Sequence, residues 1–225
     1  MKITWIGQAG LQFETNGIKI MVDPYLSDSV ERINPKNWRR VPVKEELFQE
    51  DIDIIVITHN HLDHLDPETL EKFLNTERIL TVLASYDAWQ EIRKFGKNHN
   101  YVMFNRGTIW TQTGITFTAV KAEHSDLTAI GFIVDDGKEK IYVTGDTLYN
   151  KDIFEELPQD IDAVFLPING VGNNMNITDA KRFAKNTGAK KAVPVHWGMF
   201  DELDPTEFDF ENAIIPKIYE EVKLK

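Results

Sequence analysis

The segment Thr58-His59-Asn60-His61-Leu62-Asp63-His64 restricts the fold of this chain more than any other feature. Half of the 6 histidines of the 225-residue chain lie in it, together with an aspartate. The β-branched run 52–57 before it predicts a buried strand. After it, Asp66-Pro67-Glu68 predicts a helix with Asp66 as N-cap. A tight loop between such a strand and such a helix aims several side chains at one point.

These side chains are suited to bind metal ions. His59 and His61 alternate and can face one ion, whereas the neighbours Asp63 and His64 can turn toward a second. Imidazole and carboxylate groups suit zinc, manganese or iron(II), and a chain without cysteine has only nitrogen and oxygen ligands to offer. The competing explanation is a solvated polar turn in which Asp66 is merely a helix cap.

Three further residues follow expected strands and can complete two ligand sets. His124 comes after the strand 115–120, Asp146 after 141–143, and His196 after 192–195. Singly, they can be explained as a loop residue, a turn former and a hydrogen-bonded histidine beside Trp197. Their joint placement at strand ends favours a site, because α/β proteins assemble sites there. His99 lacks such a setting, and we expect it to be exposed and uninvolved.

The chain shows a faint internal repeat. In the first half, a strand at 18–22, a strand at 52–57 and a helix at 66–74 follow one another. In the second half, a strand at 140–143, a strand ending at 167–169 and a helix at 178–186 do the same, although coincidence among short strands is the alternative. Strands at 3–6, 10–14, 79–84 and between 101 and 120, and a helix at 86–96, complete the expected elements. Two such halves predict an α/β fold, a four-layer αββα sandwich, as a single domain over residues 1–225.

Charge and hydropathy exclude several classes of protein. The net charge is -11, with 36 acidic and 25 basic residues and no basic stripe, so nucleic acid is not an expected partner. The apolar runs are much shorter than the roughly 18–20 residues of a membrane span. We therefore expect a cytoplasmic protein with a small-molecule substrate, and a homo-oligomer is an open option.

The ordered motifs resemble those of the metallo-β-lactamase superfamily, whose series runs His-X-His-X-Asp-His, then a histidine, an aspartate and a last histidine. The order fits, and so do the intervals of about 60, 22 and 50 residues. The beginning of the chain resembles one branch of this superfamily, which contains L-ascorbate-6-phosphate lactonase and relatives similar to N-acyl-phosphatidylethanolamine phospholipase D. The resemblance extends from Trp5-Ile6-Gly7-Gln8-Ala9-Gly10 to Asp23-Pro24. Many members of that branch carry histidine where this chain has Gln8, a difference that we expect to lie outside the metal shell.

The resemblance implies a ligand set and a cofactor. One ion would be bound by His59, His61 and His124, a second by Asp63, His64 and His196, and Asp146 would bridge them. Two divalent ions are implied, zinc or manganese first and iron as an alternative, and a single-ion variant stays open. Redox di-iron members carry a glutamate at the position of His61, so the histidine indicates hydrolysis.

We therefore expect a hydrolase that uses a metal-bound hydroxide to cleave a small lactone or ester, phosphorylated or not, with Asp63 and Asp146 as catalytic residues. A phosphodiesterase acting on a small or lipid-like phosphodiester is the alternative, and a non-catalytic metal-binding protein is a third class. Thioester hydrolysis and RNA processing are less favoured.

The substrate-binding side chains are less clearly marked. Arg39 and Arg40 can bind a phosphate or carboxylate, although exposed ion pairs are the favoured explanation for them. Asn169 and Asn173, around the glycine-containing loop that follows the second repeat strand, can line the pocket, although an ordinary loop explains them equally well. Trp197 neighbours His196. These five residues are the predicted substrate contacts.

Overall fold

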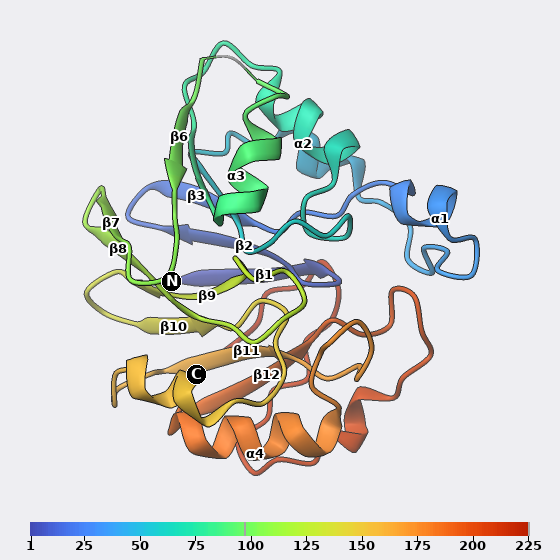
Figure 1. Cartoon of the computed structure of the whole chain (residues 1–225), viewed down its shortest axis with the longest axis vertical. Helices are drawn as coiled ribbons and strands as arrows, with labels where there is room; N and C mark the ends of the chain where they lie inside the picture. Colours follow the sequence, from blue (N-terminus) through green and yellow to red (C-terminus); the bar gives the residue numbers. More distant parts are fainter. Residues whose placement is uncertain (97, 225) are drawn as a thin grey trace.

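The computed structural model describes residues 1–96 and 98–224, and in them two six-stranded mixed sheets face each other (Figure 1). The first sheet contains, in spatial order, β1 (Lys2–Gly7), β2 (Gly10–Thr15), β3 (Ile18–Val22), β4 (Ile54–Ile57), β5 (Thr81–Ala84) and β6 (Asn100–Met103). The second contains, in the order β12 to β7, β12 (Lys191–Val195), β11 (Ala163–Pro167), β10 (Lys140–Val143), β9 (Ile130–Asp135), β8 (Ile115–Lys121) and β7 (Ile109–Gln112).

Helices cover the outer faces of the sheets. The α-helices are α1 (Ser29–Ile33), α2 (Pro67–Leu74), α3 (Tyr86–Ile92) and α4 (Ile177–Thr187), and the short 3-10 helices are η1 (Glu45–Gln49), η2 (Lys151–Glu156) and η3 (Pro205–Glu207). In Figure 1, α2 and α3 lie beyond the first sheet and α4 lies beyond the second. The order of layers is therefore α, β, β, α, and the predicted sandwich is confirmed.

Side-chain alternation along the strands produces this layering, because successive residues of a strand point to opposite faces. In β4, Ile54 and Val56 join the core between the two sheets, whereas Ile55 and Ile57 pack against α2 and α3. In β11, Ala163 and Phe165 enter the central core, while Val164 and Leu166 pack under α4. A continuously apolar strand therefore contributes side chains both to the core between the sheets and to the core under the helices.

The two halves of the chain correspond, as the repeat predicts. In the first half β3 pairs parallel with β4, and α2 then leads to β5, which pairs parallel with β4. In the second half β10 pairs parallel with β11, and α4 leads to β12, which pairs parallel with β11. Parallel pairing puts the carboxyl ends of these strands at the same edge of each sheet.

The helix boundaries follow their caps. Asp66 accepts a hydrogen bond from the Glu68 backbone N–H, with Pro67 at the first helical position, as predicted. Asn176 caps α4 through the Asp179 N–H at 2.9 Å, and Gly188 ends it in the left-handed conformation at φ 66°. These caps fix where each loop at the strand ends begins and stops.

The segment after β12 returns along the edge of the first sheet. The Tyr219 N–H donates to Trp5 O at 2.7 Å, and the Val222 N–H donates to Ile3 O at 2.8 Å. Phe208, 1% exposed, belongs to the core under α4. The segment therefore covers the otherwise free edge strand β1.

No helix within residues 1–96 or 98–224 is long and apolar enough to cross a bilayer.

His99 is an exception to the sequence-based expectation, because it is half-buried rather than exposed. Its Nε2 lies 2.8 Å from Leu74 O, and its Nδ1 accepts from the Leu80 N–H at 3.3 Å. The ring therefore ties the end of α2 to the start of β5. It lies apart from the other histidines, as expected.

Candidate metal centre

The loops at the carboxyl ends of strands from both sheets meet at one place and bring all seven predicted metal ligands together. From the first sheet, the loop after β4 supplies four of them; from the second, the loops after β8, β10 and β12 supply one each. The seven residues are His59, His61, Asp63, His64, His124, Asp146 and His196. Neither sheet alone holds a complete set.

Asp23, at the end of β3, organises the histidine loop. One carboxylate oxygen accepts from the Thr58 N–H at 2.8 Å, and the other accepts from Thr58 Oγ1 at 2.6 Å and from His64 Nδ1 at 2.8 Å. Because Nδ1 of His64 is engaged in this way, its Nε2 faces the other ligands. His59 Nδ1 lies 3.1 Å from Thr58 Oγ1, which turns its Nε2 inward as well.

Asp146 is held by the loop that precedes α4. Asn174 donates through Nδ2 to Asp146 Oδ2 at 2.8 Å, and its Oδ1 accepts from the Thr147 N–H at 3.1 Å. Gly145 before it has φ 60°, and a Cβ there would lie 2.7 Å from Ile130 O. The close approach of the strands therefore requires glycine, and it sets where the Asp146 carboxylate emerges.

Gln8 and His196 are fixed to each other across the sandwich. The His196 N–H donates to Gln8 O at 2.9 Å, and both residues have positive φ, 51° for Gln8 and 60° for His196. Gln8 Nε2 donates to Asp63 Oδ2 at 2.8 Å and lies 3.1 Å from His196 Nε2. Gln8 therefore touches two predicted ligands, closer to the centre than we expected from the sequence.

His124 is oriented from behind in the same way. Its Nδ1 lies 3.3 Å from the carbonyl oxygen of Asn173, and its Nε2 lies 3.2 Å from His61 Nδ1. The backbone carbonyl, rather than the side chain of Asn173, thus makes this contact. Because Nδ1 faces this carbonyl, Nε2 of His124 is directed toward the other histidines.

The ligand atoms form three overlapping groups, within each of which they lie within 4.8 Å of one another. The groups are His59, His61 and His124; His59, His64 and Asp146; and Asp63, His64 and His196. Asp146 joins the two histidine sets, since its carboxylate groups with both His59 and His64. Its Oδ1 is 3.2 Å from His64 Nε2, and its Oδ2 is 3.3 Å from His196 Nε2.

Three atoms of the centre lack hydrogen bonds in the part of the chain that the structure describes. They are His59 Nε2, His64 Nε2 and Asp146 Oδ1, and all three are buried. The last two form an ion pair at 3.2 Å, whereas His59 Nε2 has no such partner, and leaving a buried polar atom unsatisfied costs about 1–3 kcal/mol. Cations held between them would satisfy all three, so the residues fit a divalent metal site of nitrogen and oxygen ligands.

On the carboxylate side of the centre, charges compensate one another. Burial lowers the pKa of His196, but Asp146 and Asp63 outweigh this effect and raise it to about 10. Burial likewise lowers the pKa of His64, and the carboxylates of Asp146 and Asp23 reverse the direction and raise it. Without metal, two imidazolium ions thus supply the positive charge that bound ions would bring.

The histidine side of the centre behaves in the opposite way. Burial, reinforced by the charge of His64, holds the pKa of His59 well below its ordinary value. Burial also lowers the pKa of His124, against a partial opposing effect of Asp146. These two imidazoles are therefore neutral at pH 7 and have a lone pair available for a metal ion.

A cavity of about 270 Å³ opens onto the centre. Four predicted ligands, His61, Asp63, Asp146 and His196, line its floor. Its walls come from three segments outside the strands: the α1 segment (residues 28–40), the loop between β11 and α4, and the turn after β12. Asn169, one of the predicted substrate contacts, lies in this lining.

Asn173 is exposed and lies outside the lining, and the three remaining predicted substrate contacts have other partners. Arg39 donates to the carbonyl oxygens of Tyr25 and Val41, both at 2.7 Å. Trp197 donates through Nε1 to Pro194 O at 2.8 Å and packs on Trp5, with ring centroids 4.8 Å apart. Both side chains therefore stabilise the walls of the centre from behind.

Arg40 is not in the lining either, and it has several partners. Its Nε donates to Asp201 O at 3.0 Å, its Nη2 lies 3.6 Å from Glu202, and its guanidinium stacks on Trp38 at 4.5 Å. This arrangement fixes the turn after β12 against the α1 segment.

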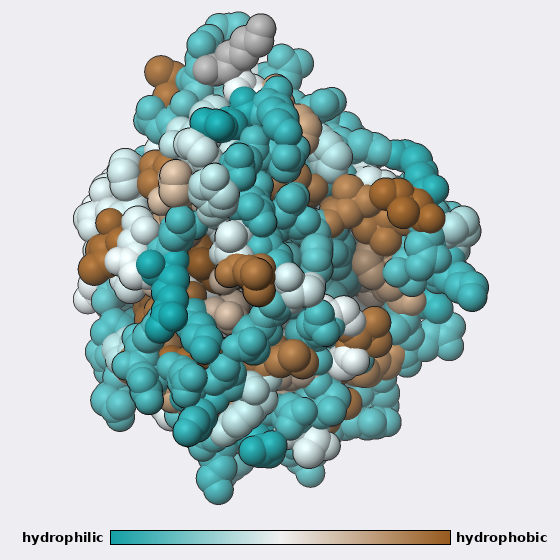
Figure 2. Space-filling model, viewed as in Figure 1, coloured by the Kyte–Doolittle hydropathy of each residue, from teal (hydrophilic) through white to brown (hydrophobic). Residues whose placement is uncertain are grey.

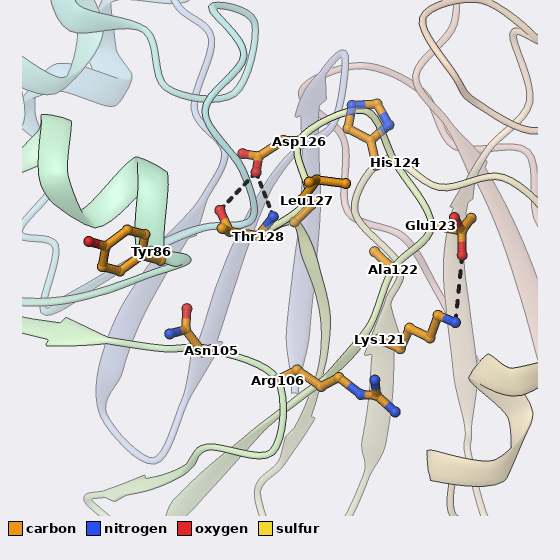
Figure 3. Close-up of a pocket in the computed structure, with 11 residues that line it drawn as sticks. Tyr86, Asn105, Arg106, Lys121, Ala122, Glu123, His124, Asp126, Leu127 and Thr128 are labelled. Carbon is orange, nitrogen blue, oxygen red and sulfur yellow. Dashed lines mark hydrogen bonds and ion pairs between the residues drawn. The ribbon is translucent and has the colours of Figure 1, made fainter.

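A larger hollow, about 460 Å³, lies on the other side of the loop that carries His124, between α3 and β8 (Figure 3). His124 is the one predicted ligand in its lining. Its two basic residues are paired, Arg106 with Glu156 and Lys121 with Glu123. The smaller cavity is therefore the one that exposes the ligand cluster.

Sequence reasoning missed Gln8, Asn174 and the role of Asp23 at this centre. Gln8 and Asp23 belong to the opening segment 5–24, and Asn174 follows the glycines of the β11–α4 loop. Their contacts join residues 28 to 188 positions apart, so local patterns carry no signal for them.

The geometry agrees with comparisons to known proteins. Residues 19–197 match the family described as "Beta-lactamase superfamily domain". A UPF0173 metal-dependent hydrolase of Aeropyrum pernix is 32% identical over 92% of this chain and 87% of its own length.

Solved structures share the fold at lower identity. Igni18, described as a novel metallo hydrolase of Ignicoccus hospitalis, superposes with a TM-score of 0.79 at 22% identity, over 98% of this chain and 97% of that one. An isothiocyanate hydrolase from Delia radicum gut bacteria superposes with a TM-score of 0.75 at 20% identity, over 99% of each chain.

We predict that Asp23→Asn lowers metal affinity about 10- to 100-fold, the usual effect of removing a partner that orients a ligand. The amide cannot accept at both oxygen positions from Thr58 and His64. Competition with a metallochromic chelator measures the affinity. Asp53→Asn is the matched control, because Asp53 accepts from the Lys19 N–H at the opposite end of the sheet. Equal affinities for the two variants would contradict the assignment.

We also predict that the metal-free protein loses stability between pH 7 and pH 10. The pKa of His196 rises from an ordinary 6.5 to about 10 on folding, so its contribution is complete below 6.5 and disappears as the pH passes through 10. Thermal melting across this range measures the effect. The slope should be smaller in His196→Gln and in metal-loaded protein, whereas an unchanged melting temperature of the metal-free protein across the range would refute it.

Proposed function

The chain belongs to the metallo-β-lactamase superfamily and, within it, to the UPF0173 metal-dependent hydrolases, and from this membership we propose that it hydrolyses a small lactone or ester. Two divalent ions, zinc or manganese before iron, would occupy the centre, with a single-ion form as the alternative. The scissile acyl group would enter through the cavity above Asp63 and Asp146.

One observation carries the proposal: the seven ligand positions converge, with buried unsatisfied atoms directed inward. His59, His61 and His124 are the proposed ligands of one ion, and Asp63, His64 and His196 those of the other. Asp146, which groups with His59 of the first set and His64 of the second, is the proposed bridge. A binding protein without catalytic activity has no need for a cavity that exposes Asp63 next to such a centre.

If bound at these positions, divalent ions would supply a water whose pKa is lowered toward about 7 and would polarise the substrate oxygen. Asp63 would accept a hydrogen bond from the attacking water and orient it toward the acyl carbon. Gln8 holds Asp63 Oδ2 in place, and Asn174 does the same for Asp146 Oδ2. Hydrolysis would join the water oxygen to the acyl carbon and break the bond to the leaving oxygen. One proton of the water would end on that oxygen, and the other would leave with the carboxylic acid.

The same ligand set can position a phosphoryl oxygen, so a small or lipid-like phosphodiester is the alternative substrate. Asn169 faces the cavity and is the proposed polar contact for the substrate. The site takes ligands from both sheets, which supports treating residues 1–225 as one domain. A cytoplasmic location is part of the proposal, and the cysteine-free sequence is compatible with it.

Metal removal and substrate comparison test the proposal together. We expect protein purified without chelator to hydrolyse small lactones or esters, to lose this activity on chelation and to regain it with zinc or manganese. The panel contains simple lactones, aryl esters and a bis-aryl phosphate. Turnover of the bis-aryl phosphate alone would favour the phosphodiesterase, and inactivity toward the whole panel after reconstitution would refute acyl hydrolysis.

We predict that Asp63→Asn lowers kcat about 10²- to 10⁴-fold, the range for loss of a residue that manages the proton of an attacking group. Metal content, measured by plasma mass spectrometry, should stay close to that of the unmodified protein. His196→Gln serves as the comparison, because removal of a ligand should lower metal content and kcat together. Parallel losses in Asp63→Asn would reduce Asp63 to a ligand.

A further inference from the structure

The walls of the cavity, in contrast to the metal ligands on its floor, consist mainly of uncharged residues. Its polar wall residues are mainly amides, with Asn37 and Asn169 half-buried on opposite segments. The lining, as far as the chain is described, includes no lysine or arginine. Amide groups both donate and accept hydrogen bonds, and they suit an uncharged polar ligand.

The one carboxylate of the walls is Asp201. Its Oδ1 accepts from the Gly198 N–H at 2.9 Å and from the Leu203 N–H at 3.0 Å, so the charge is fixed in place. A negatively charged substituent in the cavity would meet this carboxylate. Neither Arg39 nor Arg40 lies in the lining. Arg39 donates to the carbonyl oxygen of Tyr25, and Arg40 donates to the backbone carbonyl of Asp201 itself while its guanidinium stacks on Trp38.

Apolar side chains form the outer part of the cavity. Val30 comes from α1, Val171 from the β11–α4 loop and Phe200 from the turn after β12. Val171 is 69% exposed, and Phe200 is fixed edge-on against Tyr25 with ring centroids 5.5 Å apart. Apolar atoms also gather on the side of the molecule that carries α1 (Figure 2).

We propose that the cavity selects an uncharged acyl compound whose apolar substituent lies between Val30, Val171 and Phe200, rather than a phosphorylated or carboxylated one. This inference rests on the proposed function for the reacting group, which the metal centre would hold. It adds that the remainder of the substrate is bound by the amides and apolar side chains of the three wall segments.

Binding of unreactive analogues tests the selection apart from turnover. In γ-lactams, amide analogues of lactones, a substituent on the ring can be lengthened from methyl to pentyl. Calorimetry on the metal-loaded protein should show affinity rising about two- to fourfold per added methylene, as expected for burial of apolar surface. A terminal sulfonate on the pentyl chain should lower the affinity about tenfold or more, because the charge is desolvated beside Asp201.

A charge-introducing variant makes the test specific to this cavity. Val171→Lys should improve binding of the sulfonate analogue about threefold to tenfold and weaken binding of the pentyl analogue. Ile79→Lys is the matched control: Ile79 is 64% exposed and precedes β5, at the sheet edge opposite the centre. It adds the same charge and should change neither affinity.

The outcomes separate this inference from the proposed function. Equal or tighter binding of the sulfonate analogue by the unmodified protein, or no dependence on chain length, would overturn the selection of an uncharged apolar substrate. If the analogues bind as expected but no lactone or ester is hydrolysed, the proposed reaction fails while the specificity of the cavity stands.

Discussion

The buried carboxylate of Asp146 is the group on which the rest of the centre depends. It is 4% exposed, lies between His64 and His196, and needs positive charge on both sides. A buried unpaired charge costs several kcal/mol, so the fold must bring compensating groups from both sheets to this point. Protonated imidazoles compensate it in the metal-free protein, and divalent ions would replace those protons on binding. Stability, metal affinity and reactivity are therefore properties of one cluster.

Backbone strain is concentrated around the same cluster. Gln8, Asp23 and His196 all have positive φ, at 51°, 40° and 60°, a conformation that costs a residue other than glycine about 1–3 kcal/mol. Hydrogen bonds hold each of them: the Asp23 N–H donates to Val56 O, and Gln8 and His196 are bonded to each other. The sheets thus impose unfavourable local conformations where they orient ligands, which agrees with a site organised for chemistry.

Much of the fold and of the ligand cluster can be predicted from the sequence, since both are recorded in local patterns. The histidine loop follows an apolar strand, and Asp66 caps the helix after it. The strand β9 was not among the expected elements, because both of its faces are buried and its residues do not alternate. The partners Gln8 and Asn174 are brought in by the packing of distant strands, and the positions of Arg39 and Arg40 depend on the same packing. Tertiary contacts of this kind leave no periodic signal in a single sequence.

The most direct test of this account is a crystal structure of metal-loaded protein with anomalous diffraction measured at the absorption edge of the metal. The account predicts two peaks about 3.5–4 Å apart, one beside His59, His61 and His124 and the other beside Asp63, His64 and His196, with Asp146 between them. A single peak would reduce the centre to a mononuclear site. Peaks only at surface residues, with the histidines unliganded, would contradict the assignment of the centre.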